Sequence, residues 1–196
     1  MAEGMVKIDV AQVPQQTPDF QDLRHLLAEA VRSVVAKQVL EIGTDVGDTA
    51  RIFSALLQET GGQLYTVDVT PPKNNWPATW PLKNLTFIQA DARTLAWSQL
   101  VDLLFLDALP SYEGTLQLLQ ALGPYVRPGG KILVHNTLHQ EHGAQVLRAL
   151  HEWTVLTKLP WTHYPFQRGL GIIDLTYQLA PTVRSITPLS GAGVGK

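Results

Sequence analysis

The sequence contains no cysteine, which excludes a disulfide framework and any chemistry that needs a thiolate. It also has no long uncharged apolar run, because Asp102 and Asp107 interrupt its most apolar stretch. The first residues show neither the charged nor the apolar region of a signal peptide. We therefore expect neither a disulfide-stapled secreted scaffold nor a membrane-spanning protein, but a cytoplasmic one.

Charge is scarce as well. The 15 Lys and Arg residues nearly balance 17 Asp and Glu residues, which leaves a formal net charge of -2. This balance gives no reason to expect nucleic acid or a membrane surface as a partner, and it leaves a homo-oligomer open. The length of 196 residues suits one domain with a sizeable core. We predict an N-terminal segment over 1–19, one domain over 20–179, and a flexible or docked tail over 180–196.

Strand-like and helix-like apolar patterns alternate along this domain. Helical spacing predicts helices over 20–35, 47–59, 112–122 and about 140–151. Short apolar runs predict strands over 38–42, 63–69, 85–90, 101–106, 131–135, 153–159 and 170–177. The alternation predicts an α/β fold with a Rossmann-like, doubly wound, seven-stranded sheet, mostly parallel with an antiparallel last strand.

The segment 39–50, VLEIGTDVGDTA, has the order of strand, glycine turn and helix that opens a nucleoside-binding domain. A dinucleotide-binding fingerprint would place glycine at positions 43, 45 and 48, but Asp45 and Asp48 occupy two of these. Two carboxylates would repel a diphosphate, whereas they tolerate the phosphate-free, cationic sulfonium of S-adenosylmethionine. The turn therefore favours that cofactor and disfavours a nicotinamide-dependent oxidoreductase.

Acidic residues mark four successive predicted strands. Glu41 lies within the first strand, Asp68 nearly closes the second, Asp91 follows the third and Asp107 follows the fourth. Ligands of open parallel sheets bind beyond these carboxyl ends. A carboxylate at the end of the second strand can accept hydrogen bonds from both ribose hydroxyls. Taken singly, Asp68 and Asp91 could instead merely cap turns.

On these residues the chain resembles class I S-adenosylmethionine-dependent methyltransferases. It is similar to the small O-methyltransferase branch, whose first motif reads EIGTxxGxT, and the resemblance covers residues 20–177. That branch includes the catechol and caffeoyl-CoA types and divergent bacterial enzymes that tailor sugars and antibiotics. The resemblance implies that Asp68 binds the ribose and that Asp91 with Ala92 borders the adenine. It assigns the turn on the methionine side of the cofactor to Glu41, Gly43, Thr44 and Gly47.

The resemblance also implies chemistry at two neighbouring strand ends. Asp107, His135 and Asn136 match positions that hold a divalent cation in metal-dependent members, where the cation binds the substrate hydroxyl and lowers its pKa. His135 stands where those enzymes have Asp, which weakens a magnesium site and favours manganese, iron or zinc. Pro110 replaces a lysine implicated in their catalysis. In the divergent bacterial branch a histidine can instead accept the hydroxyl proton.

Metal ligand and general base therefore stay open as roles of His135. Without a metal, Asp107 would hold the amino group of the cofactor or the substrate, and we count both residues as catalytic candidates. His139 and His142 could act in place of His135, or could lie on a solvated helix start. Aromatic residues in or next to segments predicted to be loops could roof the pocket or simply pack: Trp76, Trp80, Tyr112, Trp161 and Tyr164.

We predict a methyltransferase that uses S-adenosylmethionine, with or without a divalent metal, to methylate a hydroxyl oxygen of a small-molecule substrate. The run from Asp107 to Pro110 lacks the Asp/Asn-Pro-Pro-aromatic motif of enzymes that methylate amino groups of bases. Two alternatives remain. Pro110 and His135 would suit a catalytically silent nucleoside-binding protein, and the tail would suit a structural or assembly subunit.

Overall fold

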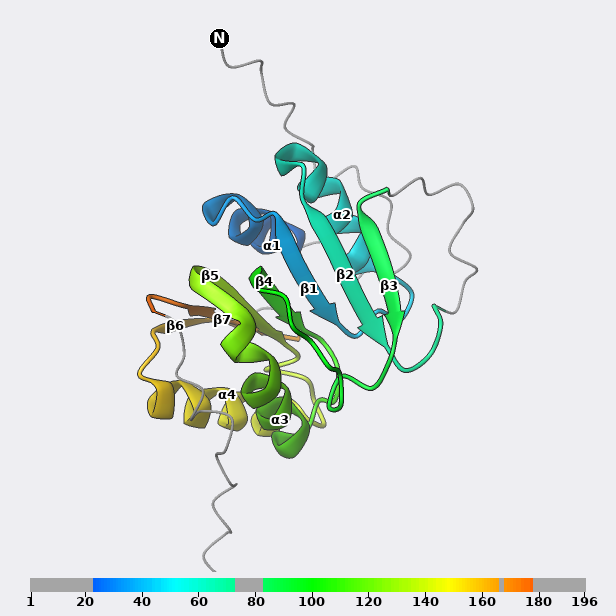
Figure 1. The fold of residues 1–196 in the computed structure, drawn as a ribbon. Coiled ribbons are helices and arrows are strands. Elements are labelled where there is room, and N and C mark those ends of the chain that lie inside the picture. The colour runs from blue at the N-terminus through cyan, green and yellow to red at the C-terminus, as the bar shows by residue number, and fades with distance from the viewer. Residues whose placement is uncertain (1–22, 73–82, 166–167, 178–196) are drawn as a thin grey trace, which may run out of the picture.

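The computed structural model describes residues 23–72, 83–165 and 168–177 (Figure 1). Its elements follow the order expected of an α/β fold. They are α1 (Leu23–Ser33), β1 (Gln38–Ile42), α2 (Asp48–Thr60), β2 (Gln63–Asp68), β3 (Leu85–Gln89), β4 (Val101–Leu106), α3 (Tyr112–Leu122), the 3-10 turn η3 (Gly123–Tyr125), β5 (Val126–His135), α4 (Gly143–Thr157), β6 (Trp161–Tyr164) and β7 (Leu170–Asp174).

All seven strands form one sheet in the order β3-β2-β1-β4-β5-β7-β6. Strands β1 to β5 run parallel to one another, and β7 pairs antiparallel with both β5 and β6. This confirms the predicted Rossmann-like sheet. Strand order reverses between β1 and β4, and the carboxyl ends of parallel strands at such a reversal form the usual ligand crevice of doubly wound folds.

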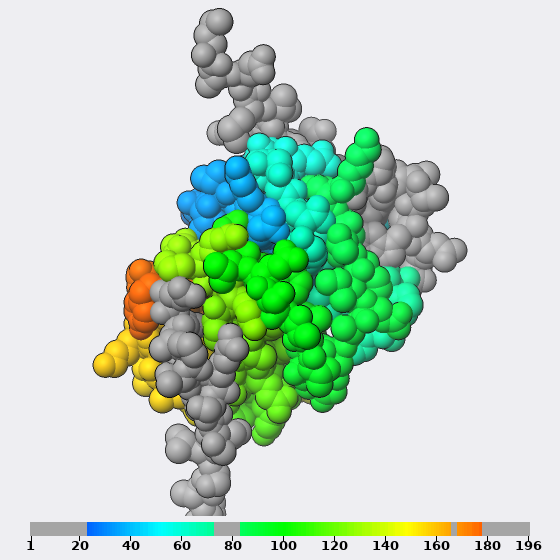
Figure 2. Space-filling model, in the orientation of Figure 1, coloured from blue at the N-terminus to red at the C-terminus, as the bar shows by residue number. Residues whose placement is uncertain are grey.

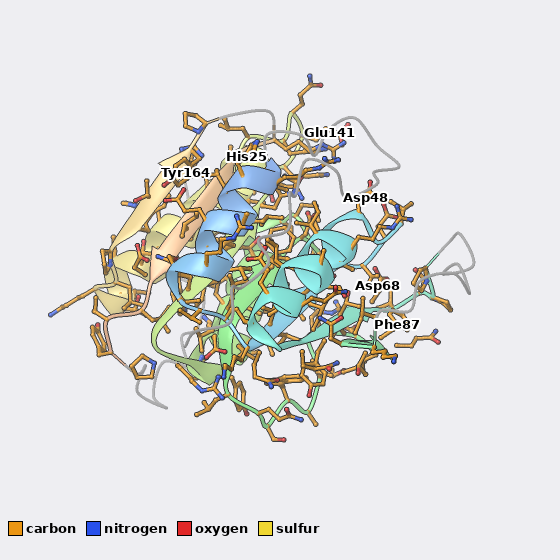
Figure 3. The ribbon with its side chains drawn as sticks, turned by 90° about the horizontal axis from the view of Figure 1, so that it is seen from above. His25, Asp48, Asp68, Phe87, Glu141 and Tyr164 are labelled. Carbon is orange, nitrogen blue, oxygen red and sulfur yellow. The ribbon has the colours of Figure 1, made fainter. Side chains whose placement is uncertain are left out.

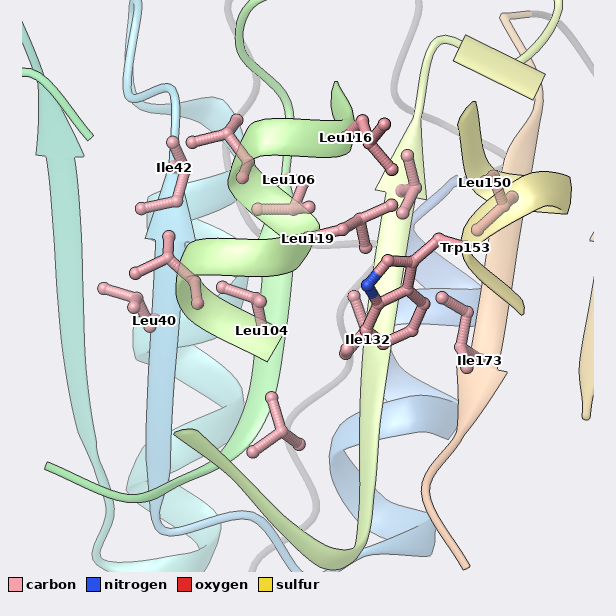
Figure 4. Packing of buried hydrophobic residues seen from close by; sticks show 14 of the residues in the cluster. Leu40, Ile42, Leu104, Leu106, Leu116, Leu119, Ile132, Leu150, Trp153 and Ile173 are labelled. Atoms are coloured by element: carbon pink, nitrogen blue, oxygen red, sulfur yellow. The ribbon is translucent and has the colours of Figure 1, made fainter. Parts of the chain in front are cut away.

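Two apolar layers hold the sheet between its helices. Helices α1 and α2 cover one face, where Phe53 meets Phe105 edge to face with ring centroids 5.4 Å apart. Helices α3 and α4 cover the other face, and Trp153 of α4 is fully buried there against Leu119 and Ile132 (Figure 4). The space-filling view shows the blue-to-green and the lime-to-orange parts of the described chain packed against each other (Figure 2).

Two boundary predictions were wrong. We expected a strand to begin at residue 131, but β5 begins at Val126. The other error concerns α4 and β6. We expected a helix to end near residue 151 and a strand to run from 153 to 159, but α4 continues to Thr157 and β6 begins only at Trp161. The buried residues of α4 keep helical spacing through this stretch: Val146, Ala149, Leu150, Trp153, Thr154 and Thr157. Packing of this apolar stripe outweighs the strand preference of the β-branched residues.

Several predictions fall on residues that the structure does not describe. The N-terminal segment 1–19, the tail 180–196 and the two tryptophans Trp76 and Trp80 all lie outside the described ranges. Trp161 and Tyr164, which we expected in a loop, are the first and last residues of strand β6. No helix in the described part of the chain has the length and apolarity needed to cross a membrane.

Candidate active site

The turn between β1 and α2 is pressed against the end of β4. Gly43 has φ +99°, and a Cβ at this position would collide with the backbone carbonyl of Asp107. Its N–H donates to the carbonyl of Val67 at 2.9 Å, while the Asp107 N–H donates to the carbonyl of Ile42 at 2.8 Å. A glycine is therefore required here, because any side chain would separate the ends of two adjacent strands.

Asp68, at the end of β2, holds this turn from the other side. One carboxylate oxygen accepts the backbone N–H groups of Thr44 and Asp45 at 3.0 and 3.1 Å. The other accepts the N–H and hydroxyl of Thr70 at 3.0 and 3.2 Å. Burial raises the pKa of the Asp68 carboxyl, but these hydrogen bonds outweigh it and leave the pKa below its ordinary value. Asp68 is thus an anion at neutral pH.

Glu41 lies fully buried beneath the turn and lines neither of the pockets described below. Thr49 of α2 donates its hydroxyl to one oxygen of Glu41, and the other oxygen has no hydrogen-bond partner. Burial raises the pKa of Glu41 to about 8, against the lowering effect of the Thr49 and Thr66 hydroxyls; the negative charges of Asp107 and Asp68 raise it further. The structure thus places Glu41 as a support of the turn rather than on the pocket surface.

Two adjoining pockets open at the carboxyl ends of the strands. The first, of about 310 Å³, lies at β2 and β3, and we call it the β2–β3 pocket; it is lined by Gly43, Asp68, Val69, Asp91, Ala92 and Leu109 among others. The second, of about 320 Å³, lies at β4 and β5, and we call it the β4–β5 pocket; it is lined by Gly43, Thr44, Asp45, Asp48, Asp107, His135, Asn136 and Arg168 among others. Gly43 borders both pockets, so no side chain divides them at this point.

The predicted residues at the strand ends thus fall into two groups. Asp68, Asp91 and Ala92 share the β2–β3 pocket, and Asp107, His135 and Asn136 share the β4–β5 pocket. Figure 3 shows Asp48, at the start of α2, and Asp68, at the end of β2, on the same side of the molecule. Gly47 precedes α2 with φ +84° and shapes the turn without lining either pocket.

Asp91 forms an exposed ion pair with Arg93. The Arg93 guanidinium lies 2.5 Å from a carboxylate oxygen of Asp91, and the Arg93 backbone N–H donates to the other oxygen at 2.9 Å. The side-chain and backbone hydrogen bonds from Arg93 lower the pKa of Asp91 to about 2. The rim of the β2–β3 pocket therefore carries both a carboxylate and a cation.

Asp107 and His135 form a dyad in the β4–β5 pocket. The Nδ1 atom of His135 lies 3.0 Å from the Oδ1 atom of Asp107, and Asn136 donates its side-chain N–H to the same oxygen at 2.6 Å. An ionised carboxylate can only accept, so this contact assigns the proton to Nδ1 and makes Nε2 the acceptor nitrogen of the neutral ring. The imidazole is nine-tenths buried and stacks on Phe105 with ring centroids 6.1 Å apart.

This arrangement does not fit a divalent-cation site. A cation would need electron pairs from Asp107, His135 and Asn136 at one point, whereas His135 and Asn136 direct N–H groups at Asp107. The described ranges contain no group of three His, Cys, Asp or Glu side chains that could hold a metal ion. The dyad instead has the geometry in which a carboxylate fixes the tautomer of a histidine base.

Arg168, between β6 and β7, lines the β4–β5 pocket and was missed by the sequence analysis. No pattern around it indicated a site, because only the pairing of β7 with β5 brings position 168 to the end of β5. Its carbonyl accepts the backbone N–H of Leu138, just beyond His135 and Asn136, at 2.7 Å. The structure therefore adds a cation to a pocket in which the sequence indicated only acids and a histidine.

Three other candidate residues lie away from both pockets. Tyr112 is the first residue of α3 and its side chain contacts α4: its hydroxyl donates to Glu152 at 2.7 Å, and the Arg148 guanidinium lies 4.6 Å from its ring centre. His139 and His142 stack on each other at the start of α4, with ring centroids 5.3 Å apart. None of the three lines either pocket, so of the two alternatives left open for Tyr112 the structure shows packing.

Residues 40–137 match a protein family described as a methyltransferase domain. This match runs from within β1 to just past the end of β5 and includes both pockets except Arg168. No curated protein sequence matches the chain. The family match therefore covers the part of the chain that forms most of the candidate site.

Solved structures share the fold at low sequence identity. A protein from Staphylococcus aureus, provisionally named a caffeoyl-CoA O-methyltransferase, has a TM-score of 0.68 at 16% identity over 85% of this chain and 88% of its own. The methyltransferase PaMTH1 from Podospora anserina, solved bound to SAH, has a TM-score of 0.63 at 15% identity over 82% of each chain. The N-methyltransferase NodS from Bradyrhizobium japonicum has a TM-score of 0.60 at 17% identity over 82% and 98%. These likenesses show the fold alone.

Proposed function

This chain belongs to the family of methyltransferase domains, and we propose that it transfers a methyl group from S-adenosylmethionine to a hydroxyl oxygen of a small molecule. The dyad of Asp107 and His135 carries the proposal for oxygen as the acceptor. A hydroxyl must lose its proton to become an effective nucleophile, and a fixed imidazole beside the transfer site can take that proton.

The two adjoining pockets support S-adenosylmethionine as the cofactor. Gly43 lines both pockets, so a bound molecule can pass from the β2–β3 pocket to the β4–β5 pocket without meeting a side chain at this position. We place the adenosine part in the β2–β3 pocket, with Asp68 at the ribose and Asp91 with Ala92 at the adenine. The methionine part then lies in the β4–β5 pocket against Thr44 and the Gly43 turn.

When bound, S-adenosylmethionine supplies an electrophilic methyl group on a sulfonium. His135 accepts, at Nε2, the proton that the hydroxyl releases while the acceptor oxygen bonds to the methyl carbon and the carbon–sulfur electron pair stays on sulfur. Asp107 holds the imidazole in orientation and stabilises the imidazolium that results. Asn136 donates its side-chain N–H to the same oxygen of Asp107 at 2.6 Å and so helps to hold the carboxylate in place.

The decisive experiment measures methyl transfer to a panel of phenols, catechols and sugar alcohols, with the product detected as a mass gain of one CH₂ unit. We expect His135→Ala to lower turnover by about 100- to 10,000-fold, the usual contribution of a general base. His139→Ala is the matched control, because His139 lies outside both pockets, and should keep wild-type turnover.

Calorimetric titration with S-adenosylhomocysteine, with and without manganese, distinguishes the proposed metal-free enzyme from a metal-dependent enzyme, a silent nucleoside-binding protein and an assembly subunit. Binding that manganese leaves unchanged supports the metal-free base. Binding and turnover that both require manganese would instead favour ligation by Asp107, His135 and Asn136. Binding without turnover on any acceptor would favour a silent nucleoside-binding protein. Absence of binding under both conditions would contradict the proposed function and favour an assembly subunit.

A further inference from the structure

The β4–β5 pocket carries an uneven set of charges. Asp45, Asp48 and Asp107 line it together with one guanidinium, that of Arg168. Asp48 is matched by Arg51 on the next turn of α2, with 3.8 Å between the charged atoms. Asp45, Asp107 and Arg168 line the same volume, so the pocket surface holds carboxylates and a guanidinium together.

The backbone that carries Arg168 is fixed against the end of β5. Gly169 has φ +75°, and a Cβ there would collide with the hydroxyl of Thr137. That hydroxyl also lies 3.0 Å from the Nε2 atom of His163 in β6. Together with the bond from Leu138 to the Arg168 carbonyl, these contacts hold position 168 beside His135 and Asn136. The backbone of Arg168 is thus fixed at the pocket, although its side chain is exposed.

A ligand that complements this pocket carries separated charges of both signs. The methionine end of S-adenosylmethionine has an ammonium, a sulfonium and a carboxylate. Building on the proposed function, we infer that Arg168 binds the carboxylate of the cofactor, while the acids Asp45 and Asp107 face its cationic groups. Arg168 would then favour ligands that carry the carboxylate over ligands that lack it. The acidic residues of the pocket cannot do this, because they repel a carboxylate.

The same guanidinium could instead bind an anionic group of the methyl acceptor. Ligands that differ only in the amino-acid end show whether Arg168 binds the cofactor or the methyl acceptor. S-adenosylhomocysteine carries the ammonium and carboxylate, its decarboxylated analogue carries only the ammonium, and 5′-methylthioadenosine carries neither. We propose to measure the affinity of all three by calorimetry, or by competition where binding is weak, in the wild type and in Arg168→Ala.

We expect Arg168→Ala to weaken S-adenosylhomocysteine binding about tenfold, the lower end for a charged hydrogen bond because the side chain is exposed. The affinities for the decarboxylated analogue and for 5′-methylthioadenosine should stay within about twofold of wild type. Arg168→Lys should lose less than Arg168→Ala, because it keeps the charge but not the planar pair of donors. Arg127→Ala, which removes a cation paired with Asp102 outside both pockets, should change none of the affinities.

Each other outcome is informative. Unchanged affinity of Arg168→Ala for S-adenosylhomocysteine would overturn the inference, and a raised KM for an anionic acceptor would then assign Arg168 to the acceptor. An equal loss for all three ligands would also overturn it, since that pattern reports a distorted pocket. If the wild type binds none of the three ligands, the proposed function itself fails. The two failures are distinguishable, because an unchanged affinity in Arg168→Ala requires that the wild type binds S-adenosylhomocysteine.

Discussion

At the scale of single residues, Asp68 combines two tasks that compete for the same oxygens. Its carboxylate accepts backbone N–H groups from Thr44, Asp45 and Thr70, so ribose hydroxyls would have to share it with the turn. We expect Asp68→Ala to weaken cofactor binding by roughly 1.5 to 3 kcal/mol, the scale of hydrogen bonds to a charged group. Titration with S-adenosylhomocysteine measures the loss. Asp174→Ala, which removes the Lys131 partner outside both pockets, is the control. An unchanged dissociation constant for Asp68→Ala would mean that the ribose lies elsewhere.

Glu41 gives a prediction about stability and pH. Burial raises its pKa to about 8, whereas the unfolded chain releases the same proton near 4.5. The stabilising effect of the bound proton is therefore complete below about pH 4.5 and is lost as pH rises towards 8. Glu41→Gln, which cannot titrate, should escape this loss and become more stable relative to wild type by roughly 2 to 4 kcal/mol between about pH 5 and pH 8.

Urea unfolding of both proteins at the two pH values provides the measurement for Glu41. The difference between the two pH values isolates Glu41, because every other titrating group is common to wild type and variant. Glutamine also keeps an acceptor oxygen for the Thr49 hydroxyl. A stability difference that does not change with pH would show that Glu41 is ionised in the folded protein throughout.

At the scale of elements, the turn between β1 and α2 depends on close contact with β4. Gly43→Ala should destabilise the fold and weaken S-adenosylhomocysteine binding at least tenfold, because the new methyl group would push the turn away from Asp107. Gly61→Ala is the matched control, since Gly61 also has positive φ but a Cβ added there would meet no atom within 4 Å. It should cost only about 1 kcal/mol in urea unfolding and leave the affinity unchanged. Equal affinity losses in both variants would contradict the role assigned to the contact.

The elements also show what local sequence can and cannot predict. Strands β1 and β4 and helix α3 lie where their patterns predicted them, because each is bounded by turn residues that end the apolar period. The run WTVLTKL looked like a strand because its β-branched residues favour one, yet Trp153 and Thr157 extend the buried stripe of α4. The acids at the strand ends were predictable from topology. Arg168 was not, because its place depends on how β7 returns along β5.

At the scale of the whole molecule, the candidate site draws on both halves of the sheet. One pocket rests on the ends of β2 and β3 and the other on the ends of β4 and β5, while the turn after β1 and the end of β4 border both. A ligand that spans both pockets therefore binds only when both halves of the sheet are folded. Because such a ligand binds the folded state alone, it must raise the stability of the entire domain.

Thermal unfolding tests this dependence. At a concentration one hundred times its dissociation constant, S-adenosylhomocysteine should add about 2.7 kcal/mol and raise the Tm by roughly 5 to 11 °C for a chain of this length. NAD at the same concentration should give no shift, because Asp45 lines the pocket where a diphosphate would lie and Asp68 holds the adjoining turn. A shift with NAD equal to that with S-adenosylhomocysteine would contradict the argument that the acids exclude a diphosphate. We would follow the unfolding of the ligand-bound protein by tryptophan fluorescence and by far-ultraviolet circular dichroism. Coincident transitions by the two probes would show that the ligand-bound domain unfolds as one cooperative unit.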